Sequence, residues 1–174
     1  GVSMGGMIAQ QIALSYPGRV QKLILGCTTC GLFGARFSLN HARLLKAYLT
    51  RPRVRSRPLP NNLVFSQAFL ASHPETLECF SQRVQIAPMP LKVKIKQLGA
   101  LFCFNSYPRL PCISAPTLVI SGTADCLVVP RNSHILARRI PGARLVFLKG
   151  CGHGFIAEAE APTARCILNF LAAG

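Results

Sequence analysis

The sequence predicts an α/β fold with a parallel sheet, because three short apolar segments alternate with helical patterns. The segments are β-branched or leucine-rich runs bounded by Gly and Pro, as expected of strands buried on both faces. They lie at 20–26, 116–122 and 143–148. Helical patterns lie at about 4–16, 131–140 and 159–172, the last with an apolar stripe of Ala164, Ile167, Leu168 and Leu171. Between the first two strand segments, further helical patterns split by prolines lie at 38–49, 62–72, 76–84 and 91–102. Such alternation is typical of an open sheet covered by helices.

The length and composition fit one folded domain without a membrane span. The chain has 174 residues, of which 50% are hydrophobic and 14% charged, so it can bury a sizeable core. Its apolar runs are shorter than the roughly 18–20 residues of a spanning helix, and its first residues lack the basic start of a signal peptide. We therefore expect no membrane partner and a cytoplasmic location.

The charge balance is strongly basic, with 20 Lys and Arg against five acids and a net charge of +15. Such a surface attracts polyanions or acidic substrates, or it simply keeps the protein in solution. The arginines within 51–57 could bind phosphates, but no aromatic residue stands between them to stack on bases. We therefore do not expect nucleic-acid binding. Asp125 is the one aspartate, so any mechanism that needs an aspartate must use it.

Eight cysteines are spread along the chain, and Cys27 and Cys30 form a lone C-x-x-C. A zinc site would need a second pair or a histidine at ligand spacing, and the pattern supplies neither. The glycines that follow at 31 and 34 indicate a loop rather than a redox helix. The sequence thus predicts buried or loop thiols, no metal and no cofactor.

The chain opens with Gly-Val-Ser-Met-Gly-Gly, which contains the pattern G-x-S-x-G before a helical run. A sharp turn from strand to helix would lift the hydroxyl of Ser3 clear of the backbone. Gly1 and Gly5 would make room for this turn, and Gly6 would let the helix approach the sheet. The backbone N–H of Met4 would then donate to an oxyanion. The alternative is that Ser3 merely caps the helix.

Asp125 and His153 each follow a predicted strand, where the carboxyl ends of parallel strands face a ligand crevice. Alone, Asp125 could form an Asx-turn, and His153 could be structural. Together with Ser3 they give the order Ser, Asp, His of one hydrolase fold. Ser3 would attack an acyl carbon, His153 would act as base, and Asp125 would orient the imidazole. We expect the other histidines, at 41, 73 and 134, to be surface or core residues.

With these motifs the sequence resembles the α/β-hydrolase superfamily, specifically its capped serine esterases and lactonases. The matching segments are 1–10, the P-G-R-V at 17–20, A-P-T-L-V-I-S-G-T-A-D at 115–125, 140–148, and G-C-G-H-G-F at 150–155. The resemblance implies a partial α/β-hydrolase fold with Ser3, Asp125 and His153 as catalytic residues and Met4 at the oxyanion hole. It also implies three regions: a nucleophile-elbow core at 1–31, a helical cap at 32–110 and a carboxyl-terminal core at 111–174.

The resemblance also implies a function and an expectation about length. The substrate would be a small carboxylic ester or lactone, although C–C hydrolases, haloperoxidases and acyltransferases share the pattern. A non-catalytic remnant that binds anions is the alternative of a different class. Family members have a first half before the elbow, so we expect this chain to be the carboxyl-terminal portion of a longer hydrolase. We expect the strand at 20–26 to have an open edge, and the isolated chain to fold poorly.

Overall fold

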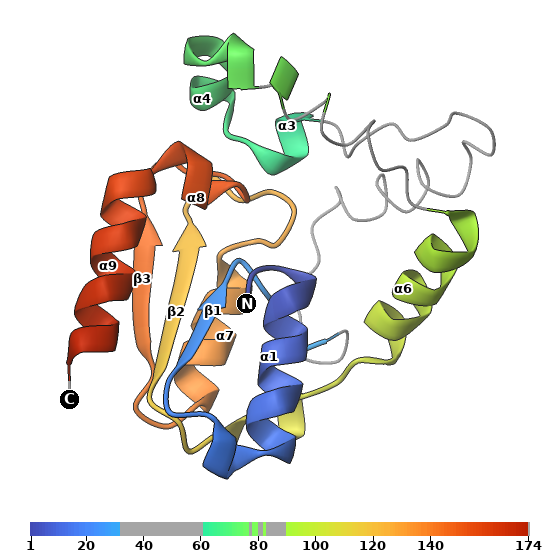
Figure 1. The fold of residues 1–174 in the computed structure, drawn as a ribbon, viewed down its shortest axis with the longest axis vertical. Coiled ribbons are helices and arrows are strands. Elements are labelled where there is room, and N and C mark those ends of the chain that lie inside the picture. The colour runs from blue at the N-terminus through green and yellow to red at the C-terminus, as the bar shows by residue number, and fades with distance from the viewer. Residues whose placement is uncertain (32–60, 77, 80–81, 83–89, 174) are drawn as a thin grey trace.

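A three-stranded parallel sheet forms the centre of the computed structural model, which describes residues 1–31, 61–76, 78–79, 82 and 90–173 (Figure 1). The strands are β1 (Leu23–Gly26), β2 (Thr117–Gly122) and β3 (Arg144–Leu148), in the order β1-β2-β3. Leu25 is opposite Val119, and Ile120 is opposite Val146. The predicted strands and their parallel pairing are confirmed.

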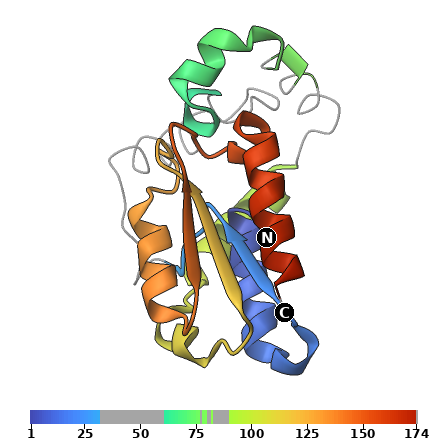
Figure 2. The same ribbon diagram turned by 90° about the vertical axis from the view of Figure 1, so that its left-hand side faces the viewer.

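Helices cover both faces of this sheet (Figure 2). On one face lie α1 (Met4–Ser15) and α7 (Arg131–Arg139), whose Ala13 and Leu136 pack with Leu25 and Val119. On the other lies α9 (Glu160–Ala172), whose Phe170 packs with Leu118 and Ile120. Neighbouring residues of a strand point to opposite faces of the sheet, and helices cover both faces here. β2 is therefore buried along its whole length.

The apolar stripe of α9 differs from the predicted one. Thr163 and Phe170 are buried and Ile167 is partly buried, but Leu168 and Leu171 are 63% and 49% exposed. The helical period was therefore right, but the face that packs on the sheet is shifted by about one residue. At the end of this helix, the ammonium of Lys22 lies over the ring of Phe170 and donates to the carbonyls of Phe170 and Leu171.

β1 is the outermost strand of the described sheet, as expected, but the residues before α1 pair with its carboxyl end. Val2 forms a parallel bridge with Gly26, whose N–H donates to the carbonyl of Gly1 at 2.9 Å. The amino group of Gly1 donates to the carbonyl of Ile24 at 2.8 Å. Gly1 and Val2 therefore run parallel to the end of β1, directly before Ser3.

Short helices lie above the carboxyl ends of the strands, in the region predicted to be a cap (Figure 1). They are α3 (Asn61–Val64) and α4 (Gln67–Ser72), and α6 (Leu91–Cys103) lies to one side. The helix expected at 62–72 is therefore two helices, which are separated by Phe65 and Ser66. The hydroxyl of Ser66 accepts the N–H of Phe69 at 3.3 Å and caps α4. The helix expected at 38–49 lies outside the described residues, and the one at 76–84 largely so. The boundaries of the three regions remain predictions.

The remaining helices are short. They are η1 (Pro17–Arg19), η2 (Tyr107–Cys112) and α8 (Phe155–Glu158), which the sequence patterns did not indicate. Among the described helices, none has both the length and the apolar character to cross a bilayer.

Glycine lets α1 approach the end of β1 closely. A Cβ on Gly6 would lie 2.6 Å from the Cβ of Thr28, and one on Gly1 would lie 2.2 Å from the carbonyl oxygen of Gly5. Thr28 is held in place because its hydroxyl donates to the carbonyl of Ser3 at 2.6 Å. The expected roles of Gly1 and Gly6 are confirmed. The role expected of Gly5 was wrong, because a Cβ there meets no described atom within 4 Å.

We predict that Gly6→Ala lowers the free energy of unfolding by about 1–3 kcal/mol, because the added methyl group overlaps Thr28. The matched control is Gly99→Ala within α6, where a Cβ has no neighbour within 4 Å. This control should gain up to about 1 kcal/mol from helix propensity. Urea denaturation measures both, and equal stability of the two variants would contradict the packing argument.

Candidate active site

Ser3 occupies a strained turn between the bridge at Val2 and the first residue of α1. Its φ is 53° and its ψ is −122°, in a region that costs a non-glycine residue about 1–3 kcal/mol. Hydrogen bonds hold this conformation: the N–H of Ser3 donates to Gly26 at 2.9 Å, and its carbonyl accepts from Thr28. The Ser3 side chain makes no capping hydrogen bond to α1, so the helix-cap alternative lacks support.

Met4 is the first residue of α1 and directly follows Ser3. The first N–H groups of a helix have no partner within the helix, and they lie at the positive end of its dipole. This position suits the oxyanion donor expected of Met4. Its role itself stays a prediction.

Asp125 follows β2 and is 3% exposed. One carboxylate oxygen, Oδ1, accepts the N–H groups of Leu127 at 2.9 Å and Val128 at 2.8 Å. The other oxygen, Oδ2, lies 2.9 Å from Nδ1 of His153. The Asx-turn alternative is therefore correct for one oxygen, and the turn aims the second oxygen at the imidazole.

His153 lies in the loop after β3 and is brought to Asp125 by close backbone packing. A Cβ on Gly122 would lie 2.2 Å from the carbonyl oxygen of Cys151 and 2.4 Å from that of Gly152. The N–H of Ala124 also donates to the Cys151 carbonyl at 2.8 Å. Because the carboxylate accepts at Nδ1, the proton belongs on Nδ1 and the lone pair on Nε2, which is the form of a general base.

The segments that carry Ser3 and His153 meet at Gly26. A Cβ there would lie 2.9 Å from the ring of Phe155, two residues after His153, and 3.0 Å from the side chain of Val2. The structure thus joins Asp125 and His153 by a hydrogen bond and packs the neighbours of Ser3 and His153 against one residue. A contact between the Ser3 hydroxyl and the imidazole stays a prediction.

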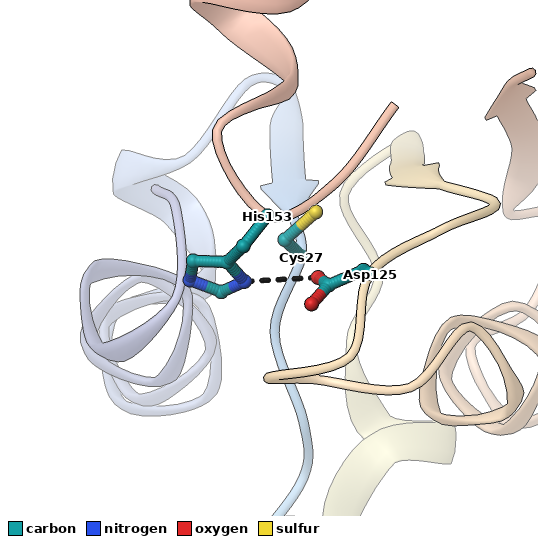
Figure 3. A group of neighbouring side chains, drawn as sticks. All are labelled: Cys27, Asp125 and His153. Carbon is teal, nitrogen blue, oxygen red and sulfur yellow. Dashed lines mark hydrogen bonds and ion pairs between the residues drawn. The ribbon is translucent and has the colours of Figure 1, made fainter. Parts of the chain in front are cut away.

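Cys27 is a third member of this group that the sequence analysis did not place there (Figure 3). Its Sγ, an oxygen of Asp125 and a ring nitrogen of His153 all lie within 4.8 Å of one another. Burial raises the pKa of the Cys27 thiol far above its usual range, and the negative charge of Asp125 raises it further. The signal in the sequence was its position directly after a strand, which the C-x-x-C pattern obscured.

The three side chains fit an Asp–His pair better than a metal centre. The Asp125 oxygens already accept two backbone N–H groups and the imidazole. That no metal works here stays a prediction.

The other histidines agree with their expected places where the structure describes them. The cysteines agree only in part, because Cys79 and Cys103 are exposed and lie in helical segments rather than buried or in loops. His73 is exposed and stacks on Phe69, with 4.4 Å between the ring centroids, and His134 is exposed near Phe147. His41 lies outside the described residues. Cys27 and Cys30 are both buried free thiols, as expected of loop residues near a core.

Comparison with known proteins identifies the family. Residues 1–160 match the family model Hydrolase_4, described as serine aminopeptidase, S33. The chain belongs to the α/β-hydrolases. This agrees with the partial fold seen here, since three parallel strands with helices on both faces follow the turn at Ser3.

Named relatives of this α/β-hydrolase have different activities. A 2-hydroxy-6-oxo-6-phenylhexa-2,4-dienoate hydrolase of Burkholderia cepacia is 31% identical over 179 residues, covering 100% of this chain and 62% of that protein. A poly(3-hydroxyalkanoate) depolymerase of Ectopseudomonas oleovorans is 31% identical over 172 residues, covering 98% of this chain and 59% of that protein. A thermophilic esterase of Thermogutta terrifontis is 28% identical, with a TM-score of 0.77, covering 98% of this chain and 62% of that one. The chain therefore spans about three fifths of the length of these relatives.

The environment of the thiols predicts their order of reaction. Iodoacetamide at pH 8 should alkylate the exposed Cys103 and Cys112 first, and Cys27 and Cys151 at least about tenfold more slowly. Burial raises the pKa of both slow thiols, so little reactive thiolate forms. Peptide mass spectrometry over time measures the rates. Alkylation of Cys27 as fast as Cys112 would contradict its assigned burial.

Proposed function

We propose that the protein is a serine hydrolase of carboxylic esters or lactones that uses Ser3 as nucleophile, His153 as base and Asp125 as acid. The observation that carries this proposal is the hydrogen bond of 2.9 Å between Asp125 and His153, at the sheet edge where Ser3 stands in a strained turn. A hydroxyl needs only an adjacent base to become a nucleophile.

The reaction has two halves. In the first, Oγ of Ser3 attacks the acyl carbon while Nε2 of His153 takes its proton, and Asp125 stabilises the imidazolium. The backbone N–H of Met4 donates to the oxyanion. His153 then gives the proton to the leaving alcohol. In the second half, His153 activates a water that hydrolyses the acyl enzyme and frees Ser3.

Two relatives support an ester as the substrate, and one supports an alternative. The relative from Thermogutta terrifontis is an esterase, and the one from Ectopseudomonas oleovorans is a depolymerase of poly(3-hydroxyalkanoate). The relative from Burkholderia cepacia is a dienoate hydrolase, so hydrolysis of a C–C bond is the second candidate. Turnover of p-nitrophenyl esters without turnover of that dienoate would favour the ester reaction. The reverse result would favour C–C hydrolysis.

We predict that Ser3→Ala lowers ester turnover at least about 10⁴-fold, because it removes the nucleophile. A fluorophosphonate probe should label the wild-type protein at Ser3, and the variant should not be labelled. Circular dichroism checks that the variant is folded. Unchanged turnover in a folded variant would refute Ser3 as the nucleophile. Absence of both turnover and labelling in the wild-type protein would instead favour the non-catalytic alternative, in which the basic surface binds anions.

We predict that Asp125→Asn lowers kcat about 10⁴-fold at neutral pH. The amide oxygen of the variant can still accept the N–H groups of Leu127 and Val128, so the loop should stay folded. Its NH₂ group, however, faces Nδ1 of His153 and forces the tautomer that carries its proton on Nε2, which cannot act as a base. Steady-state kinetics and a melting curve test this prediction together. A normal kcat would show that Asp125 does not orient the base.

A further inference from the structure

We propose that Glu158 is a positioning residue that holds the His153 loop in place and connects it to helix α4. The proposal rests on the proposed function, since it concerns how the base is kept against Asp125. Glu158 is the last residue of α8, five residues after His153, and its side chain is partly buried.

The two carboxylate oxygens of Glu158 bind two separate parts of the chain. Oε1 accepts the N–H of Gly152, directly before His153, at 2.9 Å. Oε2 accepts the N–H of Ser66, the cap residue of α4, at 3.2 Å. Hydrogen bonds to a charged acceptor are about twice as strong as those between neutral groups. One side chain thus joins the backbone beside the base to a segment that is 92 residues earlier in the sequence.

The same segment packs tightly on both glycines beside His153. A Cβ on Gly152 would lie 2.8 Å from the backbone nitrogen of Ser66, and one on Gly154 would lie 2.6 Å from the ring of Phe65. The N–H of Gly154 donates to the carbonyl of Val64 at 2.6 Å. The backbone on either side of the base is therefore fixed against residues 64–66.

The acid loop touches this segment as well. The thiol of Cys126, next to Asp125, donates to the carbonyl of Leu63 at 3.8 Å. Residues 63–66 thus contact both loops that supply the Asp–His pair. Glu158 supplies the charged contact within this arrangement, so its loss should let the His153 loop move relative to α4 and to Asp125.

The test compares Glu158→Gln and Glu158→Ala with the matched control Glu160→Gln in the full-length protein. Glu158→Gln keeps the shape but turns an NH₂ group toward one backbone N–H, so it loses one of the two bonds. Glu160 is exposed at the start of α9, and its substitution changes the same charge without touching the loop. The measurements are kcat and KM for p-nitrophenyl acetate and the melting temperature.

We expect kcat to fall about 10–100-fold in Glu158→Gln with KM changed less than about threefold, because misplacing a base by about 1 Å costs this much. Glu160→Gln should keep kcat within about twofold of the wild type. In an Asp125→Asn background the same Glu158→Gln substitution should lower kcat less than about threefold, because the geometry that it protects is already lost. A purely structural role would instead give the same loss in both backgrounds.

A readout without substrate is the proton resonance of Nδ1 of His153 in selectively labelled protein. We expect Glu158→Gln to shift or broaden this resonance and Glu160→Gln to leave it unchanged. A wild-type resonance and kcat in folded Glu158→Gln would overturn the proposal. If Glu158→Ala does not fold, the isosteric Glu158→Gln variant still tests whether Glu158 positions the His153 loop. Failure of Ser3→Ala to lose activity would instead refute the proposed function itself.

Discussion

The site depends on the parallel pairing of β2 and β3, because this pairing brings two loops from their carboxyl ends together. Gly122 lies opposite Leu148 in the register, so the chain leaves both strands at the same level of the sheet. A side chain at Gly122 would overlap the carbonyls of Cys151 and Gly152, and this close approach brings Nδ1 of His153 within 2.9 Å of Asp125. A shift of the register by one residue would separate Asp125 from His153.

Asp125 and Glu158, two of the five acidic residues, each use both carboxylate oxygens to hold loops at the carboxyl ends of the strands. Asp125 uses one oxygen to shape its own loop and the other to bind His153. Glu158 uses one oxygen to bind the His153 loop and the other to bind Ser66. The three other acids, Glu75, Glu78 and Glu160, are exposed. In a chain with a net charge of +15, the structure thus places its partly or fully buried negative charge around the imidazole.

Patterns of neighbouring residues predicted the parts of the structure that neighbouring residues determine. The strands, the main helices of the core and the turn at Ser3 follow from apolar periodicity and glycine spacing, and the Asp125–His153 pair follows from the ends of the strands. Cys27 carried the same signal, its place directly after a strand, but the C-x-x-C pattern obscured it. Glu158 could not be found in this way, because one of its two partners, Ser66, is 92 residues earlier in the sequence. The predicted face of α9 was also wrong by one residue, because the contact with the sheet, and not the period of the helix alone, decides which side packs. The described helices at 61–72 were predicted as one, since nothing in the sequence revealed the contact with the His153 loop.

Backbone strain is concentrated beside the Asp–His pair, and the sheet holds it there. Ser3 and Cys27 are the non-glycine residues with positive φ among those that the structure describes, at 53° and 42°. Each strained residue donates its N–H to a strand carbonyl at 2.9 Å: Ser3 to Gly26, and Cys27 to Ile120. These bonds, together with the bond from Thr28 to Ser3, stabilise conformations that cost about 1–3 kcal/mol each. The turn at Ser3 is therefore fixed by residues of β1 and of the loop after it. The geometry of the proposed nucleophile depends on these contacts with the sheet and not on the G-x-S-x-G pattern alone.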